Sequence, residues 1–168
     1  MSEGTETERQ TIRRIGAILH KVYPIKDRAG RVIQYVAKPL KVELLRRDLA
    51  QILVGASILA IPVGFTEEVW TLGADLPILN VAGLALISIA FIALYVYFTF
   101  YRDLFNQYRF EYVKRVLAIY LLTLAVVASL LTIIRVAPWG SESVVAIKRV
   151  VIVAFPASMS AALSDSIS

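Results

Sequence analysis

Two adjacent carboxylates, Glu67 and Glu68, follow an apolar run that is long enough to cross a bilayer, and the hydroxyl residue Thr66 precedes them. Charge at the rim of a membrane helix costs free energy, and acidic side chains grouped at a pore mouth are typical of cation channels. One interpretation is an ion-binding site for cations at the outer mouth of a pathway. The alternative is that both glutamates simply end the span at the water interface.

Two basic residues, Lys148 and Arg149, lie near the start of the last apolar stretch. If a helix begins at Ser143, Arg149 lies about 9 Å into it, at ~1.5 Å per residue. Glu67 and Glu68 have a comparable depth on a helix of opposite direction. This match predicts an ion pair between the glutamates and the basic residues, with the structural role of holding the first span against the last.

Two prolines, Pro62 and Pro156, lie inside apolar stretches and are each followed by small residues and a hydroxyl group. Proline kinks a helix and frees a backbone carbonyl, and two interrupted helices of opposite direction are typical of transport sites. Proline is also common in membrane helices without such a role. A stripe of small residues after Pro156 ends at Asp165, which is either a further pathway carboxylate or a solvated helix end.

Several classes of function are excluded by composition. Cysteine is absent, and the single histidine, His20, lies outside every apolar run. We therefore expect no catalytic site, no metal site and no cofactor, and we predict that the protein is not an enzyme. The net charge of +5 does not indicate nucleic-acid binding, because 11 of the 18 Lys and Arg residues lie ahead of the first span, between Arg9 and Arg47.

The composition is that of a membrane protein, with 58% hydrophobic residues. We predict an all-α membrane fold, a four-helix transmembrane bundle at residues 48–168 preceded by a basic region at residues 1–47. Four further basic residues lie between Arg102 and Arg115, so the positive-inside rule predicts a multi-pass protein of the cell membrane with both termini cytoplasmic. The expected spans are residues 49–69, 78–101, 116–135 and 143–164.

The basic N-terminal region has three parts. Residues 1–8 are polar and acidic, and we expect them to be disordered. Residues 9–22 have apolar positions at helical spacing and are either a surface-lying amphipathic helix or a basic topology signal. Two β-prone runs then flank Asp27–Gly30, which predicts a small β-hairpin.

Three segments resemble a family of small bacterial and archaeal integral membrane proteins of unknown function. They are AIPVGFTEEVWTLG at residues 60–73, KRVVIVAFPASMSAALSDS at residues 148–166, and AKPLKVELLRRDLAQILVGAS at residues 37–57. The resemblance covers most of the chain from about Val32 onward. It implies a four-span helical membrane protein and no particular activity.

One such bundle offers little interior for a water-filled path, so we expect a homo-oligomer joined through small-residue faces of the first and last spans. The leading hypothesis is an oligomeric cation channel or transporter with the acidic site at its outer mouth. The alternative is a non-transporting membrane subunit or sensor whose cytoplasmic region binds lipid or a protein partner. The partners expected are therefore the lipid bilayer, further copies of the chain and cations, and not nucleic acid.

Overall fold

The computed structural model describes residues 11–15, 18–26, 31–40, 44–102, 105–106 and 108–167. The chain divides into two units, Met1–Glu43 and Leu44–Ser168. The acidic start expected to be disordered, residues 1–8, and the expected turn at Asp27–Gly30 lie outside the described residues.

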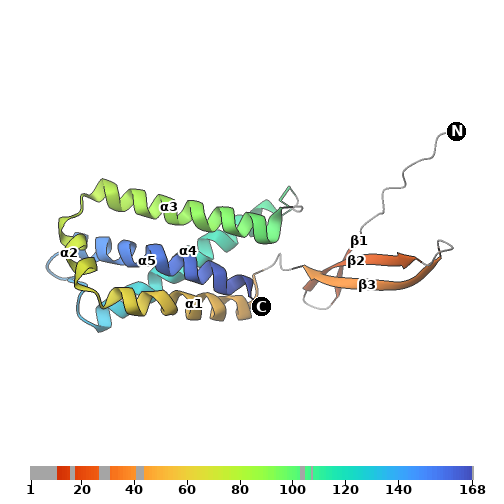
Figure 1. Cartoon of the computed structure of the whole chain (residues 1–168), viewed down its shortest axis with the longest axis horizontal. Helices are drawn as coiled ribbons and strands as arrows, with labels where there is room; N and C mark the ends of the chain where they lie inside the picture. Colours follow the sequence, from red (N-terminus) through yellow and green to blue (C-terminus); the bar gives the residue numbers. More distant parts are fainter. Residues whose placement is uncertain are drawn as a thin grey trace. The chain divides into compact units, whose positions relative to one another are not determined.

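The second unit is the predicted four-helix membrane bundle (Figure 1). The described residues contain four helices long and apolar enough to cross a membrane. The helix α5 packs against each of the others and is the most buried span. The helices are α1 (Arg46–Gly64), the short α2 (Glu67–Asp75), α3 (Ile78–Val96) with its π-helical continuation η1 (Tyr97–Tyr101), α4 (Arg109–Ile133) and α5 (Ser143–Ser166).

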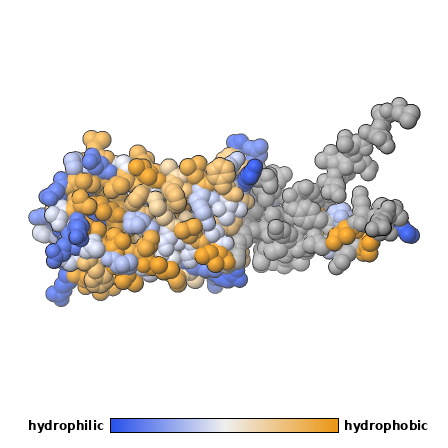
Figure 2. Space-filling model, viewed as in Figure 1, coloured by the Kyte–Doolittle hydropathy of each residue, from blue (hydrophilic) through white to orange (hydrophobic). Residues whose placement is uncertain are grey.

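The outer surface of the bundle is that of a membrane protein. Hydrophobic atoms cover much of its visible face, and hydrophilic atoms gather at its two ends (Figure 2). Large apolar side chains such as Leu79 and Leu86 are 81% and 68% exposed. In water such a surface would be unfavourable, whereas lipid chains solvate it.

Small residues allow α1 and α5 to approach closely within one chain. A Cβ atom added at Gly55 would clash with Cβ of Ser164 and lie 2.9 Å from the carbonyl oxygen of Ser160. Ala56 on α1 and Ala161 on α5 have no exposed surface. The small-residue faces of these two spans are therefore used for packing inside the protomer.

The first span ends earlier than expected. We expected residues 49–69, but α1 ends at Gly64 and the chain starts a new helix at Glu67. The Thr66 hydroxyl donates to the carbonyl of Val63 at 2.8 Å, and the Trp70 indole donates to the carbonyl of Gly64 at 2.9 Å. These side chains bind two of the last carbonyls of α1, which lack partners within the helix, at the point where the helix ends.

The other three spans agree more closely with the sequence. The helix α3 with η1 covers the predicted residues 78–101, and α5 forms a full-length span from Ser143 to Ser166. The third span begins at Arg109 and not at residue 116, because the helix also includes the basic residues that precede the predicted span. This extension brings Arg115 into the bundle.

The first unit contains an antiparallel sheet of order β1-β2-β3, formed by β1 (Thr11–Ile15), β2 (Ile18–Lys26) and β3 (Val32–Leu40). The strands β2 and β3 confirm the predicted β-hairpin. The amphipathic helix considered for residues 9–22 is wrong, since Thr11–Ile15 pairs with β2 in the register Thr11↔Val22 to Ile15↔Ile18. The β-branched residues in this segment favour a strand over a helix.

Candidate functional site

A charged triad joins three helices at the end of the bundle where α1 begins. Asp48 lies in the first turn of α1, Arg115 near the end of the second turn of α4, and Asp165 in the last turn of α5. The Arg115 guanidinium binds Asp165 through two bonds, from Nε to Oδ2 at 2.8 Å and from Nη2 to Oδ1 at 3.1 Å. Its Nη2 also donates to Oδ2 of Asp48 at 3.1 Å. All three residues are at most 1% exposed.

Aromatic side chains surround the guanidinium. The Phe100 ring lies below it, with the guanidinium carbon 4.3 Å from the ring centroid, a distance at which cation–π attraction is appreciable. Tyr101, with no exposed surface, packs edge-on against Tyr112. Both Phe100 and Tyr101 belong to η1, and π-helical turns occur often at functional sites.

The Tyr112 hydroxyl ties α4 to α3 just before this π-helical turn. It donates to the carbonyl of Ala93 at 3.0 Å. The Ala93 carbonyl thus accepts from the Tyr112 hydroxyl in addition to the backbone N–H of Tyr97, at the point where the π-helical turn begins. The Tyr112 side chain therefore connects α3 and α4 beside the triad.

The triad carries a formal charge of −1 when all three groups are ionised. Bringing such charges out of water is costly, and the attraction between them compensates only when their hydrogen bonds are well satisfied. That condition is met here, since Asp165 uses both oxygens and Oδ2 of Asp48 accepts a second bond from the backbone N–H of Leu45 at 3.0 Å. The triad can fix the register of α1, α4 and α5, and it can respond to a change in the charge of any member.

The opposite end of the bundle, where α2 lies, holds two buried or half-buried cations. Lys148 Nζ donates to the carbonyls of Ala74 at 3.1 Å and Leu76 at 2.8 Å, at the C-terminus of α2. Arg149 donates from Nε to the carbonyl of Trp70 at 3.1 Å and from Nη1 to that of Val136 at 2.6 Å. Cations at a helix C-terminus are favourable because unpaired carbonyls gather there.

The sequence-predicted acidic site is only partly assembled. Glu67 and Glu68 are exposed in the first turn of α2, and Thr66 is half-buried just before them. In the part of the chain that the structure describes, neither glutamate forms an ion pair with Lys148 or Arg149. The physical reason is that α1 ends before the glutamates, so they belong to a different helix from the one whose depth we compared.

The remaining predicted site residues are separated in space or paired differently. Pro62 is exposed on the outer face of α1, in a shallow apolar hollow, whereas Pro156 is half-buried in α5. Asp165 is not the solvated helix end considered above, because it is fully buried against Arg115. The described residues contain no group of three or more His, Asp or Glu side chains placed to hold a metal ion.

Two members of the triad, Asp48 and Arg115, were missed in the sequence. Both border uncharged runs, a position that is typical of charges that only mark the end of a span. One signal could have found them: with four crossings, the start of the first span, the start of the third and the end of the fourth all lie on the same side. Asp48, Arg115 and Asp165 occupy those three positions, with complementary charges.

Comparison with known families matches residues 24–165 to the family described as "Putative integral membrane protein (DUF2391)". The chain belongs to this family. The match includes β3 and all four spans, so membership agrees with the apolar surface and confirms the resemblance seen in the sequence. Comparisons with curated proteins and with solved structures gave no match. The family description and the four spans make this an integral membrane protein in contact with the lipid bilayer.

Proposed function

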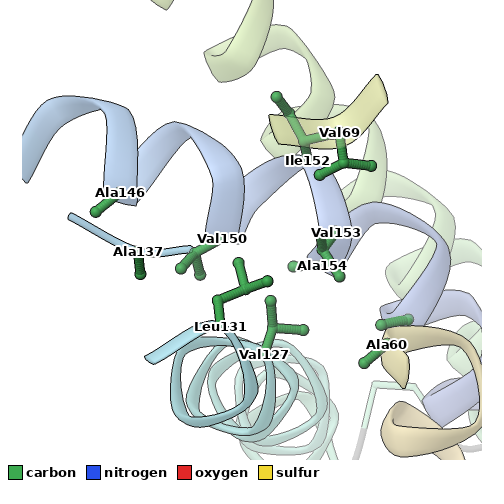
Figure 3. Close-up of a cluster of buried hydrophobic side chains, with 11 residues drawn as sticks. Ala60, Val69, Val127, Leu131, Ala137, Ala146, Val150, Ile152, Val153 and Ala154 are labelled. Atoms are coloured by element: carbon green, nitrogen blue, oxygen red, sulfur yellow. The ribbon is translucent and has the colours of Figure 1, made fainter. Parts of the chain in front are cut away.

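We propose that this protein is a non-transporting membrane subunit or sensor, in which the four-helix bundle anchors the basic N-terminal sheet. The observation that carries this proposal is the apolar core at the α2 end of the bundle (Figure 3). Eleven buried side chains from α1, α2, α4, α5 and the α4–α5 loop form one cluster there. Val127, Leu131 and Val153, for example, have no exposed surface. The side chains of this cluster offer a hydrated ion no polar ligands.

The charged groups support the same reading. Conduction requires sites that bind an ion weakly enough to release it, and protein side chains that can exchange partners. Arg115 is instead held by three hydrogen bonds to two carboxylates, and Lys148 by two to backbone carbonyls. These partners are fixed parts of the helices. The hydrogen bonds of Arg115 and Lys148 hold the helices together.

We place both termini on the cytoplasmic side of the cell membrane, because 15 of the 18 Lys and Arg residues then lie there. The N-terminal sheet would accordingly meet cytoplasmic lipid or protein. Single cysteines at Ser2, Ser141 and Ser168 of the cysteine-free chain test this orientation. Impermeant reagents added outside should label only Ser141→Cys, and external labelling of Ser168→Cys would contradict it.

A second candidate function is an oligomeric cation channel or transporter. One observation favours it: Glu67 and Glu68 are both exposed at one end of the bundle, where copies arranged around an axis would form an acidic ring. A shallow groove between α1 and α4, lined in part by Ser57, Ala125 and Ser129, offers a small-residue face for such assembly.

Cation flux from reconstituted liposomes separates the two functions. The samples are the wild-type chain, the double variant Glu67→Gln/Glu68→Gln and the matched control Glu142→Gln, an exposed carboxylate just before α5. We expect flux equal to that of protein-free liposomes in every sample. Wild-type flux above that background, reduced in the double variant and retained in the control, would replace the proposed function with the cation pathway.

A further inference from the structure

Large apolar side chains are exposed at one end of the sheet. Ile33 and Tyr35 are each 67% exposed, and Ile25 and Val32 each 45%. We call these four residues the hairpin tip. Ile25 pairs with Gln34, and Lys26 with Val32, so a bulge leaves Ile33 as the extra residue on β3. Figure 2 shows hydrophobic and hydrophilic atoms side by side among the described atoms of the sheet unit.

The hairpin tip is unusual for a sheet in water. A strand normally buries its apolar face against a second layer, and a two- or three-stranded sheet is marginal without one. The described part of this unit has a single layer of three strands. Exposed β-branched and aromatic residues in such a sheet indicate a surface that another phase or molecule covers.

The positive charge of the sheet indicates what kind of partner covers the hairpin tip. Residues 11–40 contain seven lysines and arginines against one aspartate. A second copy of the sheet would bring an equal positive charge to the contact and be repelled, whereas an anionic surface would be attracted. Tyrosine is also enriched where one end of a side chain is in lipid and the other in water. Tyr35 has that character.

The chain length keeps the sheet close to a bilayer. Five residues separate the end of β3 at Leu40 from the start of α1 at Arg46. At ~3.3–3.6 Å per residue, this link spans about 20 Å at most. The end of β3 at Leu40 is therefore tethered near the surface that α1 enters, and the hairpin tip at the other end of the strand can reach that surface when the sheet lies along it.

We propose that the hairpin tip inserts into the headgroup layer of an anionic bilayer surface, with the basic residues of the sheet bound to lipid phosphates and carboxylates. This inference deepens the proposed function, since it names anionic lipid as what the N-terminal unit binds. Each basic side chain near such a surface should raise the ratio of inserted to free sheet about five-fold. The binding should weaken as the screening length falls from about 10 Å at 0.1 M salt to about 3 Å at 1 M.

The test uses the full chain with one cysteine, Ile33→Cys, carrying an environment-sensitive fluorophore. The protein is placed singly in nanodiscs of phosphatidylcholine, with or without phosphatidylserine. We expect a blue shift and quenching by headgroup spin-labelled lipid only with phosphatidylserine, reversed by salt. Ile58→Cys on the lipid face of α1 should be shielded in both lipids, and Ser141→Cys in neither.

A neutralised variant isolates the contribution of charge. Lys21 and Lys38 are register partners on neighbouring strands, so Lys21→Gln/Lys38→Gln removes two of the seven basic residues from one point of the register while leaving the hairpin tip unchanged. We expect the inserted-to-free ratio in anionic nanodiscs to fall roughly 25-fold at most, five-fold for each lysine.

Two results would overturn the inference. One is a water-exposed probe at residue 33 in both lipids. The other is shielding that appears only when several copies share a membrane, which would assign the tip to protein contact. Neither result affects the flux assay, and flux in that assay would overturn the proposed function without changing the lipid response of the probe.

Discussion

Replacing Arg115 by methionine is the sharpest test of the charged triad. The substitution keeps a long side chain beside Phe100 but removes the cation that both Asp48 and Asp165 bind. The three hydrogen bonds to these carboxylates are lost, and both carboxylates remain buried without that cation. Removing one partner of a buried ion pair costs about 3–5 kcal/mol, so we expect at least about 4 kcal/mol here.

The companion variants give the expected order. Asp165→Asn leaves Arg115 paired with Asp48 and should cost about 2 kcal/mol, the typical loss for hydrogen bonds to a charged group. Asp48→Asn/Arg115→Met/Asp165→Leu removes all three charges and should lie within roughly 1 kcal/mol of wild type, because uncharged residues often replace buried ion pairs without loss. The matched control is Arg109→Met on the exposed start of α4, which should cost less than about 1 kcal/mol.

Reversible unfolding in mixed detergent micelles measures these values. The chain has two tryptophans, Trp70 and Trp139, and both lie at the α2 end, away from the triad. A shift of their unfolding transition therefore reports cooperative unfolding of the whole bundle. The reasoning fails if Arg115→Met is no more destabilising than Arg109→Met, or if the triple variant is as unstable as Arg115→Met alone.

Two further predictions concern packing and the α2 end. Gly55→Ala should destabilise the bundle by about 1–3 kcal/mol, the usual cost of overpacking, because its new methyl group meets Ser164. The control Gly83→Ala should not destabilise the bundle, because there is open space around Gly83. Equal unfolding transitions for the two variants would refute this prediction. Lys148→Met should cost about 1–3 kcal/mol by leaving the α2 carbonyls unpaired, and it should raise protease sensitivity at α2. The exposed control Lys114→Met should change neither quantity. An α2 as resistant to protease as in the wild type would count against the bonds from Lys148 to these carbonyls.

The fold could be predicted because it depends on apolar length. A stretch of about 20 uncharged residues can satisfy its backbone in lipid only as a helix, so the number of spans follows directly from composition. The two prolines inside the spans do not change the predicted number of spans. Pro62 lies in the last turn of α1 and Pro156 inside α5, and both helices continue past them.

The end of the first span could not be located by hydropathy. Val63, Gly64 and Phe65 are apolar and read as continuous span, yet the helix ends there. The Thr66 hydroxyl followed by two acidic residues is a helix-start signal that competes with apolar length, and it was the better guide. The short helix α2 was missed for this reason, and the predicted pairing of its glutamates was misplaced with it.

The triad could not be located by counting uncharged residues, because that count treats every arginine as the end of a span. Arg115 costs less inside the bundle than the count assumes, since two carboxylates and an aromatic face surround it. The burial of Arg115 depends on contacts between three helices, and no local sequence pattern predicts those contacts. The comparison of depth between antiparallel helices gave a wrong ion pair at the α2 end, and it was not applied to the end where Asp48, Arg115 and Asp165 lie.

The two ends of the bundle stabilise buried charges with different kinds of partner. At the triad, charge is balanced by charge, so substitutions can be compensated by neutralising a partner. At the α2 end, Arg149 is bound to the carbonyls of Trp70 and Val136, which stay polar whatever replaces the arginine. Since no second substitution can remove a backbone carbonyl, the loss of Arg149 cannot be compensated as the loss of Arg115 can, and the bonds from Lys148 to the carbonyls of Ala74 and Leu76 then remain as the cationic contacts to α2.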